Sequence, residues 1–282
     1  MKVRTQLQSA KSLFLDAHIN EVDAELLLAH LLGITRMDLH NSVKVEQRLS
    51  EVESVTDIFD EFAHSCQRRL QGEPVQYITG VAHFHNLTLS VGPGVLIPRP
   101  ETEAIVESIL THLKGVTTPT SVIDLGAGSG ALAIAVATQA PITRVVAVEN
   151  DEAALAYLKK NIEACDAQIS VVAESVETAL QGVKADIVVA NPPYIKEGEI
   201  LPIDVMKYEP HFALFGGSTG MEIPTMFITA AARLLKTDGL LLIEHGEDQP
   251  ELIATALSSN FVNIINHRDH NDRPRWTSAT RR

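Results

Sequence analysis

The sequence has little cysteine and no long uncharged apolar run, and each shortage excludes a class of protein. Only Cys66 and Cys165 occur among 282 residues, without CxxC spacing, so neither a disulfide framework nor a cysteine-based zinc site is expected. No apolar stretch approaches the roughly 18 residues of a membrane span, and the first residues lack the apolar segment of a signal peptide. We therefore expect a reduced, cytoplasmic protein with no membrane partner.

Positive charge is also scarce. Lys and Arg number 23 against 36 Asp and Glu, which gives a formal net charge of −13. Such an excess of carboxylates repels polyanions, so no broad nucleic-acid or anionic-membrane surface is expected. Aromatic residues make up only 5% of the chain, but 45% of its residues are apolar, which is enough for a buried core. Length and composition predict one or two folded domains.

The first part of the chain has the periodicity of helices. Apolar residues recur at spacings of three and four over Leu26–Leu31 and again over Val55–Leu70. Gly33 provides a helix end after the first stretch, and Gly72-Glu73-Pro74 breaks the second. We therefore expect a small all-helical domain over residues 1–80.

The period then changes to that of strands. Phe84, Leu87 and Leu89 alternate with polar neighbours, and Gly92-Pro93-Gly94 turns the chain before another apolar run. This pattern predicts a β-hairpin linker over residues 81–97.

Residues 98–282 alternate short β-branched runs with helical patterns. This rhythm predicts an α/β domain of Rossmann-like architecture, in which helices flank a mostly parallel sheet. The expected strands cover residues 122–125, 145–148, 169–172, 187–190, 240–243 and 262–265.

A glycine-rich loop follows the first of these strands. Glycines let the backbone approach a ligand closely, and the helix that begins after the loop offers unpaired N–H groups. The spacing Gly126-x-Gly128-x-x-Ala131 also fits a dinucleotide fingerprint, so the glycines alone do not separate NAD from S-adenosylmethionine. The predicted cofactor contacts here are Asp124, Gly126, Ala127, Gly128, Ser129 and Gly130.

Two carboxylates narrow the choice of cofactor. Glu149 ends the next strand, where a carboxylate can accept hydrogen bonds from both ribose hydroxyls of either cofactor. Asp124 precedes the first glycine, and its charge suits a ligand that carries an ammonium group and would repel a phosphate. We therefore predict that both residues contact S-adenosylmethionine.

Asn191-Pro192-Pro193-Tyr194 directly follows an apolar strand and should face the same cleft. Asn191 offers a side-chain carbonyl, and two prolines restrict the position of the Pro192 carbonyl. Two fixed acceptors can bind both hydrogens of a planar –NH2 group, while Tyr194 supplies a flat face for stacking. We predict Asn191, Pro192 and Tyr194 as catalytic, all four residues as substrate contacts, and Asn191 as a further cofactor contact.

The 11 histidines raise the question of a metal site. The closest groupings are His83 with His85 and His267 with His270, and neither stands beside a set of carboxylates and cysteines. We therefore expect no metal. Glu244-His245-Gly246 at a strand end is compatible with an acid/base pair or with a structural role, and no function is assigned to it here.

Five motifs stand out along the chain: Leu96-Ile97-Pro98-Arg99-Pro100-Glu101-Thr102-Glu103, Asp124 to Gly130, Asn191 to Tyr194, Tyr208 to Leu214 and Leu242 to Gly246. Jointly, they resemble the protein-(glutamine-N5) methyltransferases that modify peptide-chain release factors, and the resemblance runs nearly end to end. It implies a helical docking domain, a hairpin and an S-adenosylmethionine-dependent methyltransferase domain. It also implies that the substrate is the glutamine of the Gly-Gly-Gln motif in class I release factors. The net charge of −13 predicts no direct nucleic-acid contact.

The sequence departs from the family pattern at a few positions. Glu149 stands where members commonly have Asp, and this longer carboxylate should still reach a ribose. The resemblance places adenine-side contacts at Glu174 and Ser175, where members often have Asp followed by a bulkier residue. The tail lacks the D-L-A-G-x-x-R form, so Arg273 and Arg275 receive no role.

Two other functions are compatible with parts of the pattern. N-P-P-Y also occurs in amino-group methyltransferases that act on DNA or RNA bases, but such an enzyme needs a basic groove, which the net charge disfavours. A catalytically silent scaffold would not need Gly126, Glu149 and Asn191, which are all present.

Overall fold

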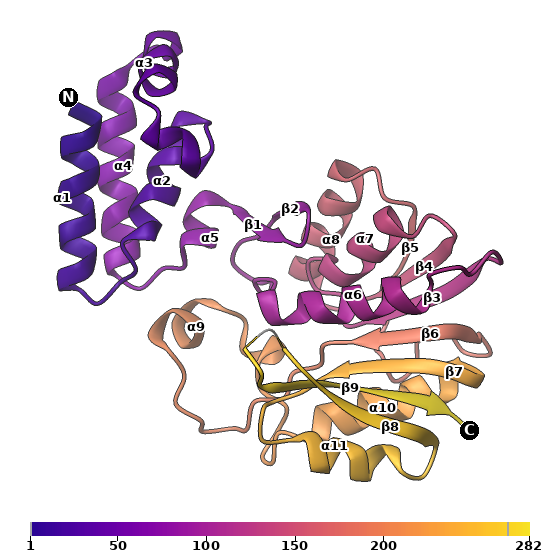
Figure 1. Ribbon diagram of the computed structural model, residues 1–282. Coiled ribbons are helices and arrows are strands. Elements are labelled where there is room, and N and C mark those ends of the chain that lie inside the picture. Colours follow the sequence, from indigo (N-terminus) through magenta and orange to yellow (C-terminus); the bar gives the residue numbers. More distant parts are fainter. Residues whose placement is uncertain (1, 270) are drawn as a thin grey trace. The chain divides into compact units, whose positions relative to one another are not determined.

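The computed structural model describes residues 2–269 and 271–282, which form two compact units (Figure 1). The first unit comprises Met1–Gly80 together with Pro202–Tyr208, and the second comprises Val81–Leu201 with Glu209–Arg282. Within the described residues, no helix is long and apolar enough to cross a membrane.

The first unit is all-helical. Phe14, Leu27, Leu28 and Phe62 are almost fully buried and form its core, because the apolar faces of three helices converge on them. Gly33 ends one of these helices in a left-handed conformation, with φ of +62°. The helices are α1 (Lys2–Asp16), α2 (Val22–Leu32), α3 (Ser42–Glu51), α4 (Val55–Leu70), α5 (Val75–Thr79) and α9 (Ile203–Tyr208), with the 3₁₀ turn η1 (Arg36–His40).

Among the described residues, the second unit contains a seven-stranded sheet in the order β5-β4-β3-β6-β7-β9-β8. The five strands from β5 to β7 in this order are parallel to one another, whereas β9 is antiparallel to both β7 and β8. A separate hairpin pairs β1 with β2. The strands are β1 (Val81–Phe84), β2 (Leu87–Ser90), β3 (Thr120–Leu125), β4 (Thr143–Val148), β5 (Ile169–Val172), β6 (Ala185–Ala190), β7 (Leu235–Glu244), β8 (Phe261–Arg268) and β9 (Pro274–Arg281).

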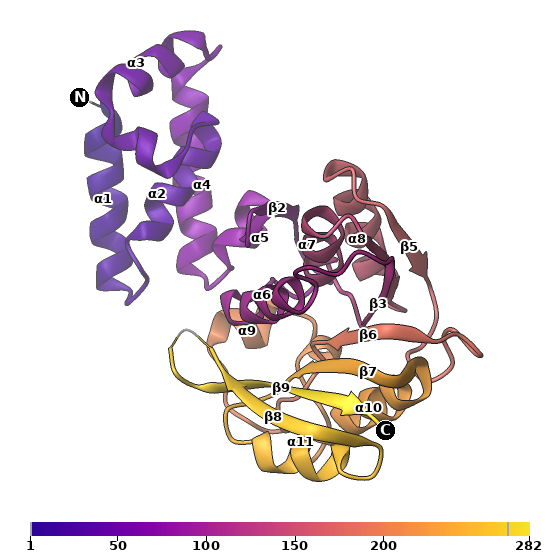
Figure 2. The same ribbon diagram turned by 45° about the vertical axis from the view of Figure 1, so that its right-hand side comes forward.

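Helices cover both faces of this sheet (Figures 1 and 2). Successive residues of β6 point to opposite faces, so Ile187 and Val189 pack under α6, α7 and α8, while Val188 and Ala190 pack against α10 and α11. This confirms the predicted Rossmann-like α/β architecture. The helical elements of the unit are η2 (Pro100–Thr102), α6 (Glu103–His112), α7 (Ala131–Gln139), α8 (Glu152–Ala164), η3 (His211–Ala213), α10 (Glu222–Leu234) and α11 (Pro250–Leu257).

The hairpin differs from the one that the sequence predicts. Its turn lies at His85 and Asn86, because His85 adopts a positive φ of +52° and the chain reverses there. Ser90, the last residue of β2, pairs its N–H and C=O with the side chain of Asn161 on α8. The ladder therefore ends before residues 91–97, which form no strand.

The last strand, β9, was not predicted. It lies between β7 and β8, although it follows both in the sequence. Its alternation is weak because Thr277, a polar residue, is fully buried and is bonded to Asn266 and His245. Hydrogen bonds to distant side chains make this burial possible, and such partners are not visible in a local pattern.

Candidate active site

A cavity of about 250 Å³ lies in the second unit, at the carboxyl ends of the parallel strands. It is lined by the loop after β3, the ends of β4 and β6, part of the segment that leads into η2, and one face of α10. The chain leaves β3 toward β4 on one side and β6 lies on the other, so this is the switch point of the sheet. Open α/β sheets bind ligands at this place.

Gly128 and Gly130 of the loop after β3 both have a positive φ, but the surroundings of their Cα atoms differ. Gly128 has a φ of +56° and lines the cavity, and a Cβ at this position would meet nothing within 4 Å. Gly130 has a φ of +87°, and a Cβ there would lie 2.6 Å from Leu158 Cδ1. Gly128 thus keeps backbone open toward a ligand, whereas Gly130 allows α7 to pack against α8.

Asp124, on β3, offers an unpaired negative group to the cavity. Its Oδ2 accepts a hydrogen bond from the N–H of Ala133 at 3.1 Å, while its Oδ1 is buried and has no partner among the described residues. Burial raises the pKa of Asp124 to about 7, the Ala133 N–H opposes the shift, and the nearby Glu149 adds to it. A cationic group bound in the cavity would pair with this oxygen.

Glu149 lies at the end of β4 and is 7% exposed. Its Oε2 accepts from the N–H of Gly128 at 2.8 Å, and its Oε1 accepts from those of Asn150 and Asp151 at 2.7 and 2.9 Å. Oε2 accepts only one hydrogen bond and retains a lone pair for a ligand hydroxyl, whereas Oε1 already accepts two. With Asp124, this residue makes the cavity acidic, which fits a cationic nucleoside ligand better than a diphosphate.

The other cofactor residues predicted on this side are divided between the cavity and its surroundings. Ala127, Ser129 and Ser175 line the cavity. Gly130 is the N-cap residue of α7 and Glu174 is exposed, and neither belongs to the described lining.

The Asn191–Tyr194 segment follows β6, as the sequence predicts. Asn191 and Pro193 line the cavity. Pro192 is buried and Tyr194 is half-buried, and the lining drawn from the described residues contains neither of them. The hydroxyl of Tyr194 donates instead to Glu244 Oε1 at 3.3 Å.

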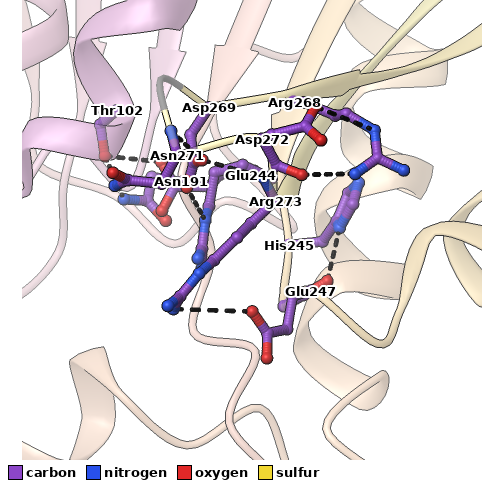
Figure 3. Close-up of polar contacts among 12 residues, drawn as sticks. Thr102, Asn191, Glu244, His245, Glu247, Arg268, Asp269, Asn271, Asp272 and Arg273 are labelled. Atoms are coloured by element: carbon purple, nitrogen blue, oxygen red, sulfur yellow. Dashed lines mark hydrogen bonds and ion pairs between the residues drawn. The ribbon is translucent and has the colours of Figure 1, made fainter.

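A hydrogen-bonded chain extends from Asn191 into the core. Asn191 Nδ2 donates to Thr102 Oγ1 at 3.3 Å, and Thr102 donates to Glu244 Oε2 at 2.6 Å. Figure 3 shows these three residues lying together, although Asn191 follows β6, Thr102 lies in η2 and Glu244 ends β7. Burial raises the pKa of Glu244 to about 7, and the Thr102 hydrogen bond and Arg275 oppose the shift.

Glu209 fixes the segment that borders the cavity before η2. It is 4% exposed, accepts from the N–H of Ile97 at 3.1 Å and pairs with the guanidinium of Arg99 at 2.6 Å. Arg99 lines the cavity, so the lining contains a cation as well as the carboxylates of Asp124 and Glu149.

The similarity to known proteins covers the whole chain. Family profiles match residues 5–80, as the PrmC N-terminal domain, and residues 102–207, as the Methyltransferase small domain. The release factor glutamine methyltransferase of Mycolicibacterium smegmatis is 35% identical over 99% of this chain and 98% of its own. The one of Chlorobaculum tepidum is 34% identical over 97% and 95%. This chain belongs to the release factor glutamine methyltransferase family.

A solved structure supports the fold of this family member. The 16S rRNA N2 G1207 methyltransferase of T. thermophilus, in complex with AdoMet and guanosine, superposes with a TM-score of 0.54 and 23% identity. The match covers 72% of this chain and 50% of that one. At this identity the likeness shows the methyltransferase fold and carries no statement about substrate.

The sequence by itself indicates no catalytic or binding role for Thr102, Glu209 or Glu244 of this methyltransferase. All three lie within motifs that carry the family resemblance, which is the signal that could have found them. Their partners are 50 to 142 residues away in the sequence, so spacing could not reveal them.

The methyltransferase has no group of three or more His, Cys, Asp or Glu residues that could hold a metal within its described residues. His83 and His267 bond instead to the hydroxyls of Thr88 and Ser278. His270, part of one histidine pair in the sequence, lies outside the described residues.

Proposed function

We propose that this enzyme transfers a methyl group from S-adenosylmethionine to the side-chain amide nitrogen of the glutamine in the Gly-Gly-Gln motif of class I peptide-chain release factors. The observation that carries the proposal is the full-length similarity to release factor glutamine methyltransferases. The acidic cavity bordered by Asn191 provides chemistry suited to this reaction.

The residues of the cavity fit the methyl donor. The unpaired Oδ1 of Asp124 would hold the ammonium group, and Glu149 would accept from the ribose hydroxyls. The open space at Gly128 leaves room for close approach, and Ser175 would lie on the adenine side, with Glu174 nearby in the sequence. When bound, S-adenosylmethionine supplies an electrophilic methyl group.

The protein contributes to catalysis mainly by orienting the side-chain amide of the substrate glutamine. A carboxamide nitrogen is a poor nucleophile because its lone pair is delocalised into the carbonyl. Oδ1 of Asn191 and the carbonyl oxygen of Pro192 would accept the two N–H groups and direct the nitrogen toward the donor, with Pro193 beside them. These hydrogen bonds strengthen as positive charge develops on nitrogen. The N-methylated amide cation is acidic enough to give its proton to water, so no strong general base is needed. Tyr194 contributes by holding Glu244.

Residues 1–80 are proposed as the docking element for the release factor. This segment carries more acidic than basic residues, and Glu53, Asp60 and Glu61 are exposed in or just before α4. A release factor works against ribosomal RNA, so the region around its Gly-Gly-Gln motif should be basic, and opposite charge would favour association. The proposal includes a cytoplasmic location, where ribosomes terminate translation.

Amino-group methylation of DNA or RNA bases, the alternative reading of N-P-P-Y, is not favoured. The full-length relatives are named for a protein substrate, and the net charge of −13 opposes a nucleic-acid groove.

A methyl-transfer assay tests the proposed function. The enzyme is incubated with isotopically labelled S-adenosylmethionine and a purified class I release factor, and mass spectrometry locates the label. We expect one methyl group on the Gly-Gly-Gln glutamine, and none when that glutamine is replaced by alanine. Transfer to a nucleic acid but not to the release factor would overturn the proposal.

A further inference from the structure

The side chain of Asn191 has two ends of nearly equal shape and opposite hydrogen-bonding character. Its oxygen accepts hydrogen bonds, its amino group donates them, and a half-turn of the amide exchanges the two. The substrate amide presents –NH2, which only donates. Methyl transfer therefore requires the oxygen of Asn191 to face the substrate, and another group must select that orientation.

Thr102 lies at the amino end of the Asn191 side chain. Nδ2 donates to the Thr102 hydroxyl at 3.3 Å, and both residues line the cavity (Figure 3). Thr102 is 4% exposed, so water competes little for its hydroxyl. A threonine hydroxyl has one proton and two lone pairs. It accepts from Asn191 when its own proton is directed elsewhere.

Glu244 accepts the hydrogen bond that the Thr102 hydroxyl donates. Thr102 Oγ1 donates to Glu244 Oε2 at 2.6 Å, and this carboxylate is 1% exposed at the end of β7. Its other oxygen accepts from the Tyr194 hydroxyl. An ionised carboxylate only accepts, so the hydrogen bonds have one direction, from Asn191 through Thr102 to Glu244.

We propose that Thr102 and Glu244 are positioning residues that fix the orientation of the Asn191 amide, and through it the preference of the site for glutamine over glutamate. The inference rests on the proposed function. In the flipped orientation, Oδ1 of Asn191 would face the lone pairs of Thr102, and its amino group would face the substrate. An amino group there binds a carboxylate better than an –NH2 group. Glutamine and glutamate have the same shape, so the hydrogen-bonding groups of the site decide between them. The Pro192 carbonyl can only accept, whereas Asn191 can present either end of its amide to the substrate.

The substitutions Thr102→Val and Thr102→Ser test the inference. Valine keeps the shape but removes the hydroxyl, whereas serine keeps it. The measurements are made at pH 8, above the pKa of about 7 to which burial raises Glu244, so that the carboxylate is mostly ionised. They comprise kcat, the Kd for S-adenosylmethionine, the thermal unfolding temperature, and the Kd values for a Gly-Gly-Gln and a Gly-Gly-Glu release factor.

For Thr102→Val we expect kcat to fall roughly tenfold and the preference for the Gly-Gly-Gln over the Gly-Gly-Glu release factor to fall by a similar factor. The Kd for S-adenosylmethionine should stay the same, and Thr102→Ser should restore both affected quantities. Thr138→Val serves as the matched control, since Thr138 donates to the carbonyl of Ile134 on α7 and is absent from the described cavity lining. It should change neither quantity.

Two results would overturn the inference. One is a Thr102→Val enzyme with unchanged kcat and unchanged preference for glutamine. The other is a parallel loss of kcat, cofactor binding and unfolding temperature with the preference intact, because that marks a structural role. Failure of the unmodified enzyme to methylate the Gly-Gly-Gln glutamine would instead contradict the proposed function, so the two failures are distinguishable.

Discussion

At the scale of single residues, the protonation state of Asp124 should control the affinity for S-adenosylmethionine. Its carboxyl is buried with one unpaired oxygen, and burial raises its pKa to about 7. The ionised form binds an ammonium group and the protonated form does not. We expect the affinity for S-adenosylmethionine to be roughly tenfold lower at pH 6 than at pH 8, measured by titration calorimetry. Methylthioadenosine, which lacks the ammonium group, provides the control, and an equal pH effect on both ligands would contradict this role.

The same residue affects stability. The folded protein binds the Asp124 proton more tightly than the unfolded chain, whose pKa is near 3.8, so this group makes stability fall as pH rises from about 4 to about 7. Above pH 7 its contribution is constant. Asp124→Asn should therefore raise the unfolding temperature at pH 8 while weakening S-adenosylmethionine binding. Thermal unfolding at pH 5 and pH 8 measures the effect, and an equal gain at both pH values would rule out this linkage.

Asn191 carries the proposed contact to the reacting nitrogen. We expect Asn191→Ala to fold and to bind S-adenosylmethionine, but to lose roughly 10²-fold or more in kcat, because a hydrogen bond that strengthens in the transition state is removed. Single-turnover kinetics with saturating release factor check this. Near-normal turnover would show that another group orients the amide.

At the scale of elements, two glycines of the loop between β3 and α7 serve different purposes: Gly130 allows close helix packing, and Gly128 leaves space for the ligand. Gly130→Ala places a Cβ 2.6 Å from Leu158 Cδ1 and 3.0 Å from Ile134 Cδ1, at a φ of +87°. We expect a loss of about 3 kcal/mol in the free energy of unfolding, from strain and overpacking together. Urea unfolding measures it.

Gly128→Ala is the matched change in the same loop. Its Cβ would meet no protein atom within 4 Å, so the loss in stability should be only about 1 kcal/mol, from the positive φ. Binding of S-adenosylmethionine should weaken instead, because the methyl group occupies space beside the ligand. If both variants lost the same stability and the same affinity, the division between packing and binding would be wrong.

At the scale of the whole molecule, charge should steer the release factor. Reversal of three exposed carboxylates of the first unit to lysine, at Glu53, Asp60 and Glu61, should raise the KM for the release factor roughly tenfold at low salt and less at high salt. Steady-state kinetics at two salt concentrations check this, and kcat should not change.

The control changes the net charge by the same amount on the second unit. Glu107, Glu163 and Glu177 are exposed there, and their reversal to lysine should leave KM nearly unchanged. An equal rise in KM for both triple variants would point to net charge alone and against docking through residues 1–80.

Much of this protein was determined by the sequence itself. The periodicity along the chain located the α4 helix and six strands of the large sheet, because each segment records in its own residues which side is buried. The glycine loop and Asn191 could be placed at strand ends for the same local reason. Because open α/β sheets bind ligands at the carboxyl ends of their parallel strands, both were expected at one edge of the sheet, and the cavity lies there.

The tertiary structure decided what depends on partners far along the chain. The ladder of the hairpin ends at Ser90, which bonds to the side chain of Asn161. The buried Thr277 of β9 is likewise bonded to side chains outside its own strand. The chain from Asn191 through Thr102 to Glu244 likewise joins residues up to 142 positions apart. A local pattern records which residues are buried, whereas the direction of a hydrogen bond between distant side chains is set only when the sheet brings them together.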